Sequence, residues 1–86
     1  MYVVLSYDVG VKRVRKALAV CRKYLLHVHK SVFEGNLTDA ELGRLKRELA
    51  AVVDPSRDSV AIYKVAAPRF LTKEKLGMAE EPKEIV

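Results

Sequence analysis

The chain has 86 residues, of which 50% are hydrophobic, and its formal net charge is +5 at pH 7. This length leaves room for one small domain, and the hydrophobic content excludes an intrinsically disordered polypeptide. The positive balance favours anionic partners such as nucleic acid or an anionic membrane surface.

The N-terminal segment, residues 2–9, is predicted to form a strand. It is rich in β-branched and aromatic residues, and no Gly or Pro occurs before Gly10. Successive side chains of a strand point to opposite faces of its sheet. One face is therefore apolar and the other becomes polar toward its end. The apolar face consists of Val3, Leu5, Tyr7 and Val9. The face that becomes polar consists of Val4, Ser6 and Asp8.

Residues 11–25 are predicted to form a helix that follows a turn at Gly10. Apolar residues recur at helical spacing on one stripe, which consists of Val11, Val14, Leu18, Cys21 and Leu25. Residues 9–33 contain no acid and seven basic residues, which are Lys12, Arg13, Arg15, Lys16, Arg22, Lys23 and Lys30. The positive charge is therefore concentrated in one segment of the chain.

The middle of the chain predicts extended structure and then a second helix. Residues 26–35 form either one bent strand or two short strands around Lys30-Ser31. The helix runs from Thr38 to about Val53, because Thr38 and Glu41 have the spacing of a capping box. Asp54-Pro55 ends this helix.

The C-terminal third predicts one further clear strand at residues 59–66, which Ala67-Pro68 stops. Residues 69–77 form a short strand or an arm, and residues 78–86 form a flexible tail. With two strands in the middle, the element order is that of an α+β, ferredoxin-like βαββαβ domain over residues 1–77. Both helices then cover one face of the sheet. Apolar side chains left on the other face predict a homodimer.

The single cysteine, Cys21, cannot form an internal disulfide, so nothing indicates an oxidising compartment. Its place on the apolar stripe predicts a core residue. The N-terminal apolar run is too short to span a membrane and lacks the basic start of a signal peptide. A cytoplasmic protein without membrane association is therefore expected.

Asp8 has two interpretations. A carboxylate at a strand end beside a basic segment suits a Mg²⁺ site that acts on a phosphodiester, since Mg²⁺ takes few protein oxygen ligands and keeps several waters. A twofold axis near the strand end would supply a second carboxylate from a partner. Alternatively, Asp8 caps the turn or helix that follows. Spacing alone favours the cap.

Other polar and aromatic residues also leave two interpretations open. The basic side of the first helix either binds phosphates or is an ordinary solvated face. His27 and His29 are two residues apart, so on a regular strand they share a face. They either serve as metal ligands or acid–base groups, or they simply face solvent. Aromatic residues such as Tyr7 and Phe33 either stack on bases or belong to the core.

Several sequence segments together resemble the CRISPR-associated Cas2 family, the small partner of the Cas1 integrase. They are Val-Val-Leu-Ser-Tyr-Asp at 3–8, Arg-Val-Arg at 13–15, Ser-Val-Phe-Glu-Gly-Asn-Leu at 31–37, a Glu- and Leu-rich helix, Asp-Pro at 54–55 and Asp-Ser-Val-Ala-Ile-Tyr at 58–63. The resemblance covers residues 2 to about 66 in order, and more loosely residues 75–77. This chain departs from the family's pattern at the short Val9-Gly10-Val11 turn. It also departs at His27 and His29, where Arg and Gln are common in the family.

The resemblance implies a ferredoxin-like homodimer in which the last strand, residues 69–77, adds to the partner's sheet. It implies that Asp8 is the catalytic residue and the Mg²⁺ ligand in cleavage of RNA or DNA, supported by Tyr7 and Phe33. Nucleic acid is then bound by basic residues of the first helix, which are Lys12, Arg13, Arg15 and Lys16.

Three functions remain open from the sequence. The first is a metal-dependent endonuclease of the spacer-acquisition machinery. The second is a structural adaptor that bridges Cas1 subunits and holds duplex DNA without cutting it. The third is a toxin-like ribonuclease of the same fold, unconnected to CRISPR.

Overall fold

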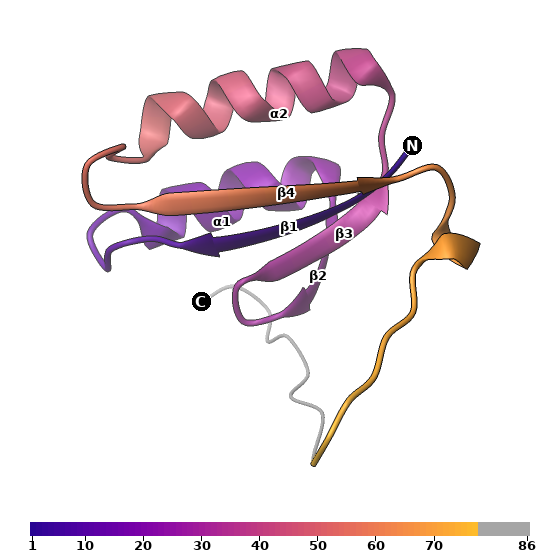
Figure 1. Ribbon diagram of the computed structural model, residues 1–86. Helices are drawn as coiled ribbons and strands as arrows, with labels where there is room; N and C mark the ends of the chain where they lie inside the picture. The colour runs from indigo at the N-terminus through magenta and orange to yellow at the C-terminus, as the bar shows by residue number, and fades with distance from the viewer. Residues whose placement is uncertain (78–86) are drawn as a thin grey trace.

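The computed structural model describes residues 1–77, and these form a sheet of four strands with two α-helices (Figure 1). The elements in chain order are β1 (Tyr2–Asp8), α1 (Val14–Tyr24), β2 (Leu26–His29), β3 (Val32–Asn36), α2 (Asp39–Val52), β4 (Ser59–Val65) and a short 3₁₀ helix, η1 (Pro68–Phe70). The strand order is β2-β3-β1-β4, and every neighbouring pair is antiparallel. The predicted ferredoxin-like βαββαβ fold is confirmed.

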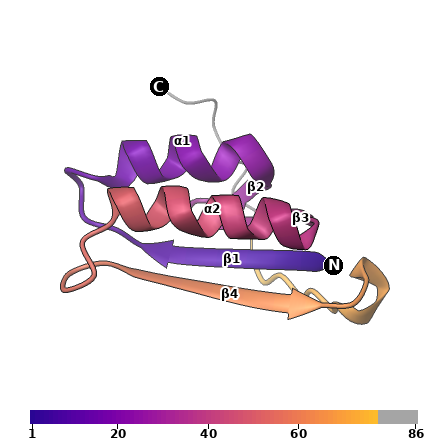
Figure 2. The same ribbon diagram turned by 90° about the horizontal axis from the view of Figure 1, so that it is seen from above.

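The domain has two layers, with both helices on one face of the sheet (Figure 2). Val3, Leu5 and Tyr7 of β1 alternate with less buried residues and form the centre of the core under the helices. Leu45 of α2 and Cys21 of α1 pack onto them, so the prediction that Cys21 is a core residue is confirmed.

The first helix starts later than its apolar spacing predicts. Residues 11–13 form a turn, and α1 begins at Val14. Val11 therefore lies off the helix and its side chain is 87% exposed, so its assignment to the buried stripe was wrong. The rest of the stripe faces the core: Cys21 and Leu25 are buried, and Val14 and Leu18 are half-buried and pack against the core. Ala17, which the stripe did not include, is also fully buried.

The extended segment at residues 26–35 consists of two strands, β2 and β3, which turn at Lys30-Ser31. The register shifts between His27 and His29, because His27 lies opposite Phe33 whereas His29 lies opposite Val32. This bulge places the two imidazoles on opposite faces of the sheet. The prediction that they share a face was wrong, because it assumed an unbroken two-residue period.

The second helix begins at the predicted capping box. Thr38 Oγ1 accepts a hydrogen bond from the Glu41 amide at 3.1 Å, and Glu41 Oε1 accepts one from the Thr38 amide at 2.9 Å. The helix ends at Val52, just before the expected Asp54-Pro55 stop. These bonds satisfy two main-chain donors that the helix itself leaves unpaired.

The chain after β4 leaves the sheet as an arm. After η1, residues 71–77 form no strand within the single chain. The arm lies beside the open face, and Lys73 Nζ donates to Glu34 Oε1 of β3 at 2.5 Å. The predicted tail, residues 78–86, lies outside the described residues. In the part of the chain described, no helix is both long and apolar enough to cross a membrane.

Candidate functional site

Asp8 is the last residue of β1 and lies on the face of the sheet that the helices leave open. Its side chain shares this face with Val4 and Ser6, and it pairs in register with Ser59 of β4. Asp8 is exposed, and within residues 1–77 its carboxylate forms no hydrogen bond or ion pair. Both carboxylate oxygens therefore face solvent at the end of a strand.

The capping interpretation of Asp8 is contradicted by the turn that follows it. The N-cap of α1 is Arg13, which forms no side-chain capping bond, and the first turn of the helix contains no acid. The amide of Gly10 donates instead to Asp58 Oδ1, at 2.9 Å. A different aspartate therefore holds the turn, and Asp8 has no structural partner there.

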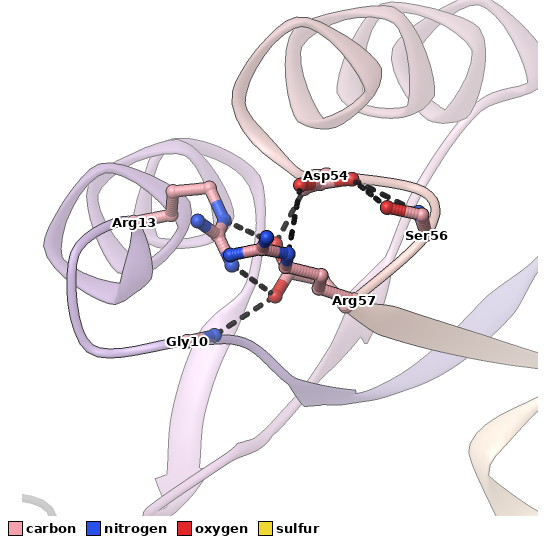
Figure 3. Close-up of polar contacts among 6 residues, drawn as sticks. Gly10, Arg13, Asp54, Ser56 and Arg57 are labelled. Atoms are coloured by element: carbon pink, nitrogen blue, oxygen red, sulfur yellow. Dashed lines mark hydrogen bonds and ion pairs between the residues drawn. The ribbon is translucent and has the colours of Figure 1, made fainter.

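Asp58 is surrounded by donors from two loops. Arg13 contacts it twice, through Nε to Oδ2 at 2.6 Å and through Nη2 to Oδ1 at 2.8 Å. The amides of Gly10 and Asp54 donate to the same carboxylate, the latter at 2.8 Å. Gly10, Arg13 and Asp54, which make these contacts, are labelled in Figure 3. We call this group of four residues the Asp58 clamp.

The clamp keeps Asp58 ionised. The hydrogen bonds from Arg13, and then those from the Asp54 and Gly10 amides, hold the pKa of the Asp58 carboxyl well below its usual value, although burial opposes this. The same pairing raises the pKa of the Arg13 guanidinium. The Asp58 side chain is 0% exposed and that of Arg13 is 25% exposed. The pair is thus an enclosed, bidentate ion pair.

This pairing changes the role expected for Arg13. Its Nε and Nη2 both donate to Asp58, so this edge of the guanidinium is not available to a phosphate. The other basic residues predicted to bind nucleic acid, Lys12, Arg15 and Lys16, are exposed at the start of α1. The structure therefore separates Arg13 from the three basic residues with which the sequence grouped it.

Tyr7 and Phe33 lie on the helix-covered face, opposite Asp8. Their ring centroids are 5.4 Å apart, and both side chains are buried. Burial raises the pKa of Tyr7 to about 12. Neither residue can touch a group bound at Asp8, because alternation along β1 points Tyr7 into the core. Both are core residues, which was the alternative to base stacking.

The two histidines do not form one site. His27 stacks on Phe33 with 4.5 Å between ring centroids, and its Nε2 lies 3.0 Å from the Lys30 carbonyl oxygen. His29 lies on the open face, beside Val32. Within residues 1–77, no three His, Cys, Asp or Glu side chains are grouped as a metal site would require.

A polar group that the sequence did not predict lies on the open face. Glu34 is almost fully buried there and accepts hydrogen bonds from the Tyr2 hydroxyl at 2.6 Å and from Lys73. Burial opposes its ionisation, but these two donors outweigh burial and lower the pKa of Glu34. The Tyr2 pKa is raised to about 12, chiefly by the hydrogen bond to Glu34. The arm and this face border an open groove of about 350 Å³.

The residues at Asp8 fit Mg²⁺ in chemistry but are too few in one chain. Carboxylate oxygens are the ligands Mg²⁺ prefers, and Mg²⁺ usually keeps several waters. Glu34, on the same face, is already bonded to Tyr2 and Lys73, and among residues 1–77 Asp8 belongs to no group of three potential ligands. A second copy packed on the open face would bring the second carboxylate.

The chain matches known proteins over most of its length. A family model described as CRISPR associated protein Cas2 matches residues 1–73. The CRISPR-associated endoribonuclease Cas2 of Pyrococcus furiosus is 44% identical over 82 residues, which cover 95% of this chain and 94% of that protein. The protein of the same name from Dictyoglomus turgidum is 36% identical over 84 residues, covering 98% and 97%.

Solved structures agree with these relatives. A crystal structure described as Cas2 superposes with a TM-score of 0.87 at 35% identity, covering 100% of this chain and 97% of the other. Streptococcus pyogenes Cas2 gives a TM-score of 0.77 at 33% identity, covering 90% and 100%. The protein therefore belongs to the CRISPR-associated Cas2 family.

Proposed function

We propose that this protein is a homodimeric, Mg²⁺-dependent endoribonuclease of a CRISPR system, in which Asp8 of each copy holds the metal ion. The observation that carries the proposal is the state of Asp8, whose exposed carboxylate has no protein partner within residues 1–77. The relatives are CRISPR-associated endoribonucleases by name, and this supports the proposed class of reaction.

The open face supports the dimer in this proposal. Tyr63 of β4 lies opposite Val4 on this face and is 60% exposed, and Leu26 of β2 lies opposite Glu34 and is 71% exposed. Large apolar side chains exposed on one face of so small a domain favour burial against a second copy. A twofold axis on this face brings the two Asp8 residues toward each other.

In this proposal the metal ion, Asp8 and the basic residues each have a separate role. A bound Mg²⁺ supplies a nucleophilic water and neutralises the charge of the scissile phosphate. The two Asp8 carboxylates hold the ion, and their mutual repulsion favours its binding. Lys12, Arg15 and Lys16 lie exposed at the start of α1, where they hold the phosphates that flank the site.

The test compares wild type with Asp8→Asn, which keeps the shape of the side chain and removes the charge. Cleavage of single-stranded RNA with Mg²⁺ should fall by more than about 100-fold, since even residues behind a metal ligand contribute roughly 10–100-fold. Dimer formation and RNA binding should be unchanged. Asp39→Asn, at an exposed aspartate on α2, is the matched control and should cleave normally. Undiminished cleavage by pure Asp8→Asn protein would refute the assignment.

A second function is the adaptor of spacer acquisition, which holds duplex DNA and the Cas1 integrase without cutting. The observation that favours it is the exposed basic start of α1, which needs no metal to bind phosphates. If wild type binds duplex DNA and Cas1 but cleaves neither RNA nor DNA, the adaptor function replaces the nuclease. Lys12→Gln and Lys16→Gln should then weaken DNA binding, while Asp8→Asn leaves it intact.

A further inference from the structure

The end of β1 that carries Asp8 has fewer neighbours than the rest of the strand. On the β3 side, β1 pairs as far as Ser6 and its last main-chain bond runs from the Tyr7 amide to the Ser31 carbonyl, whereas its pairing with β4 continues to Asp8 and Ser59. β4 is an edge strand, so the Asp8–Ser59 pair has no further strand beside it. A terminal pair of this kind opens easily unless a group beyond it holds the two chains together.

The Asp58 clamp is the group that lies beyond this pair. Asp58 directly precedes Ser59, and Gly10, whose amide donates to Asp58, follows Asp8 by two residues. The bond therefore joins the two segments immediately past the last pair of the ladder. The carboxylate is 0% exposed, so water does not compete for it.

The Arg13 side chain packs against the backbone of Gly10 and completes the Asp58 clamp. A Cβ added to Gly10 would lie 2.6 Å from Arg13 Nη2, which shows that the guanidinium packs directly on the backbone there. Its planar fork meets both oxygens of Asp58, a geometry that a lysine cannot reproduce. Gly10, Arg13 and Asp58 are therefore fitted to one another.

We propose that Arg13 and Asp58 are positioning residues for Asp8. The clamp fixes the end of β1 so that the Asp8 carboxylate lies where its metal and substrate require it. Arg13 acts through Asp58 and not on the nucleic acid. This inference rests on the proposed function of Asp8, for which a misplacement of about 1 Å would cost on the order of 100-fold in rate.

Gly10→Ala is the sharpest test, because it displaces the guanidinium without removing any charge. We expect kcat to fall by roughly 10–100-fold in Gly10→Ala and in Arg13→Gln, as for other residues that orient a metal ligand. KM should stay within about 3-fold, since ground-state binding is untouched. The double variant Arg13→Gln/Asp58→Asn should be no slower than the worse single variant.

Arg57→Gln is the matched control for these variants. Arg57 lies on the same loop as Asp58, but its side chain is 74% exposed and its Nε is 3.8 Å from Asp54 Oδ2. Losing this arginine should leave kcat at the wild-type value. All rates are compared below the melting temperature of the least stable variant and at equal dimer fraction, so that loss of folded protein does not mimic the effect.

Salt dependence of RNA binding separates positioning from phosphate contact. Each lost phosphate contact on a single strand lowers the slope of log K against log salt by about 0.7. Lys16→Gln should show this change, and Arg13→Gln should not. If Arg13→Gln lowers the slope as Lys16→Gln does, and its rate effect adds to that of Asp58→Asn, Arg13 is a phosphate ligand and the proposal is overturned.

Two measurements test the clamp without cleavage. Amide exchange at Gly10 and Asp54, and broadening of resonances near Asp8 by Mn²⁺, are compared in wild type and Gly10→Ala. Faster exchange with weaker broadening supports the clamp, even if wild type cleaves no RNA and the proposed function fails. Unchanged exchange and broadening overturn it. So does a wild-type cleavage rate in both Gly10→Ala and Asp58→Asn, which leaves the proposed function standing.

Discussion

The two faces of the sheet differ in what their side chains contact. On the helix-covered face, Leu5 and Phe33 are fully buried and are enclosed by both helices. On the open face, the same strands present Val4, Ser6 and Asp8, and the last of these is exposed without a partner in the described chain. One strand, β1, thus supplies the centre of the core and the candidate metal ligand on alternate residues.

Substitutions on the two faces should therefore have different effects. The covered face sets the stability of the single chain, because its residues gain their contacts within that chain. The open face sets assembly and chemistry, because its apolar and acidic groups still lack partners there. The predictions below test this division of roles between the two faces.

The largest effect on stability is expected on the covered face. Leu45 is fully buried, so Leu45→Ala should lower the free energy of unfolding by about 2–5 kcal/mol through lost contacts and a residual cavity. Leu26→Ala makes the same chemical change on the open face, where the side chain is 71% exposed in the single chain, and it should cost less than about 0.5 kcal/mol when the dissociated chain is unfolded below the dimer dissociation constant. Urea unfolding measures both, and equal losses would contradict the division.

The next effect concerns assembly through the open face. Tyr63→Glu places a charge where we propose that two copies meet, and it should raise the dimer dissociation constant by roughly 30-fold or more. Ala50→Glu, on an exposed position of α2, carries the same charge on the other side of the molecule and should leave the dimer intact. Sedimentation equilibrium tests the pair. A dimer broken by Ala50→Glu alone would place the interface on the helices.

A smaller effect is expected at the start of α2, which covers the core. Thr38→Ala removes one bond of the capping box and should lower the free energy of unfolding by about 1 kcal/mol. Cleavage by the folded protein should not change, because α2 lies on the face away from Asp8. Thermal unfolding and a cleavage assay on one sample measure both. A drop in kcat would show that the two faces are coupled.

The smallest effect compares two tyrosines with raised pKa values. Burial raises the pKa of Tyr7 to about 12 on the covered face, and the hydrogen bond to Glu34 raises that of Tyr2 to about 12 on the open face. Glu34→Gln should therefore return only Tyr2 toward its usual pKa of about 10. Absorbance titration of the phenolates shows whether one of these two tyrosines or both ionise near pH 12 in the variant. A return of both toward their usual pKa would contradict separate causes.

The raised pKa values of Tyr2 and Tyr7 also determine how the free energy of unfolding changes at alkaline pH. Both phenols keep their protons longer in the folded chain than in the unfolded chain. Their contribution to stability is thus complete below pH 10 and is lost as the pH rises from about 10 to about 12. Glu34→Gln should make this loss shallower, which urea unfolding at several pH values would show.

Much of the fold follows from local sequence patterns. Alternation in residues 2–8 identified the buried face of β1, and Thr38 with Glu41 marked the start of α2 within one residue. The same alternation placed Asp8 on the open face. These features depend on residues close together in the chain, so their physical causes can be seen in a single sequence.

The clamp and the bulge could not be predicted in this way. Arg13 and Gly10 meet Asp58 across 45 and 48 residues, and no local period reports such a contact. Two aspartates around a short loop, Asp54 and Asp58, were the one signal present. The bulge between His27 and His29 depends on how β2 pairs with β3, whereas the spacing of the histidines alone suggests a regular strand.

β4 lies at the edge of the sheet, and this position has a consequence for handling the protein. The outer side of its seven residues presents main-chain amides and carbonyls to solvent, with Lys64 as its one charged residue. Such a row is a template on which any extended segment can add as a fifth strand. At high concentration, a second copy of the chain could therefore add along this edge, and charged substitutions on β4 should reduce such polymerisation.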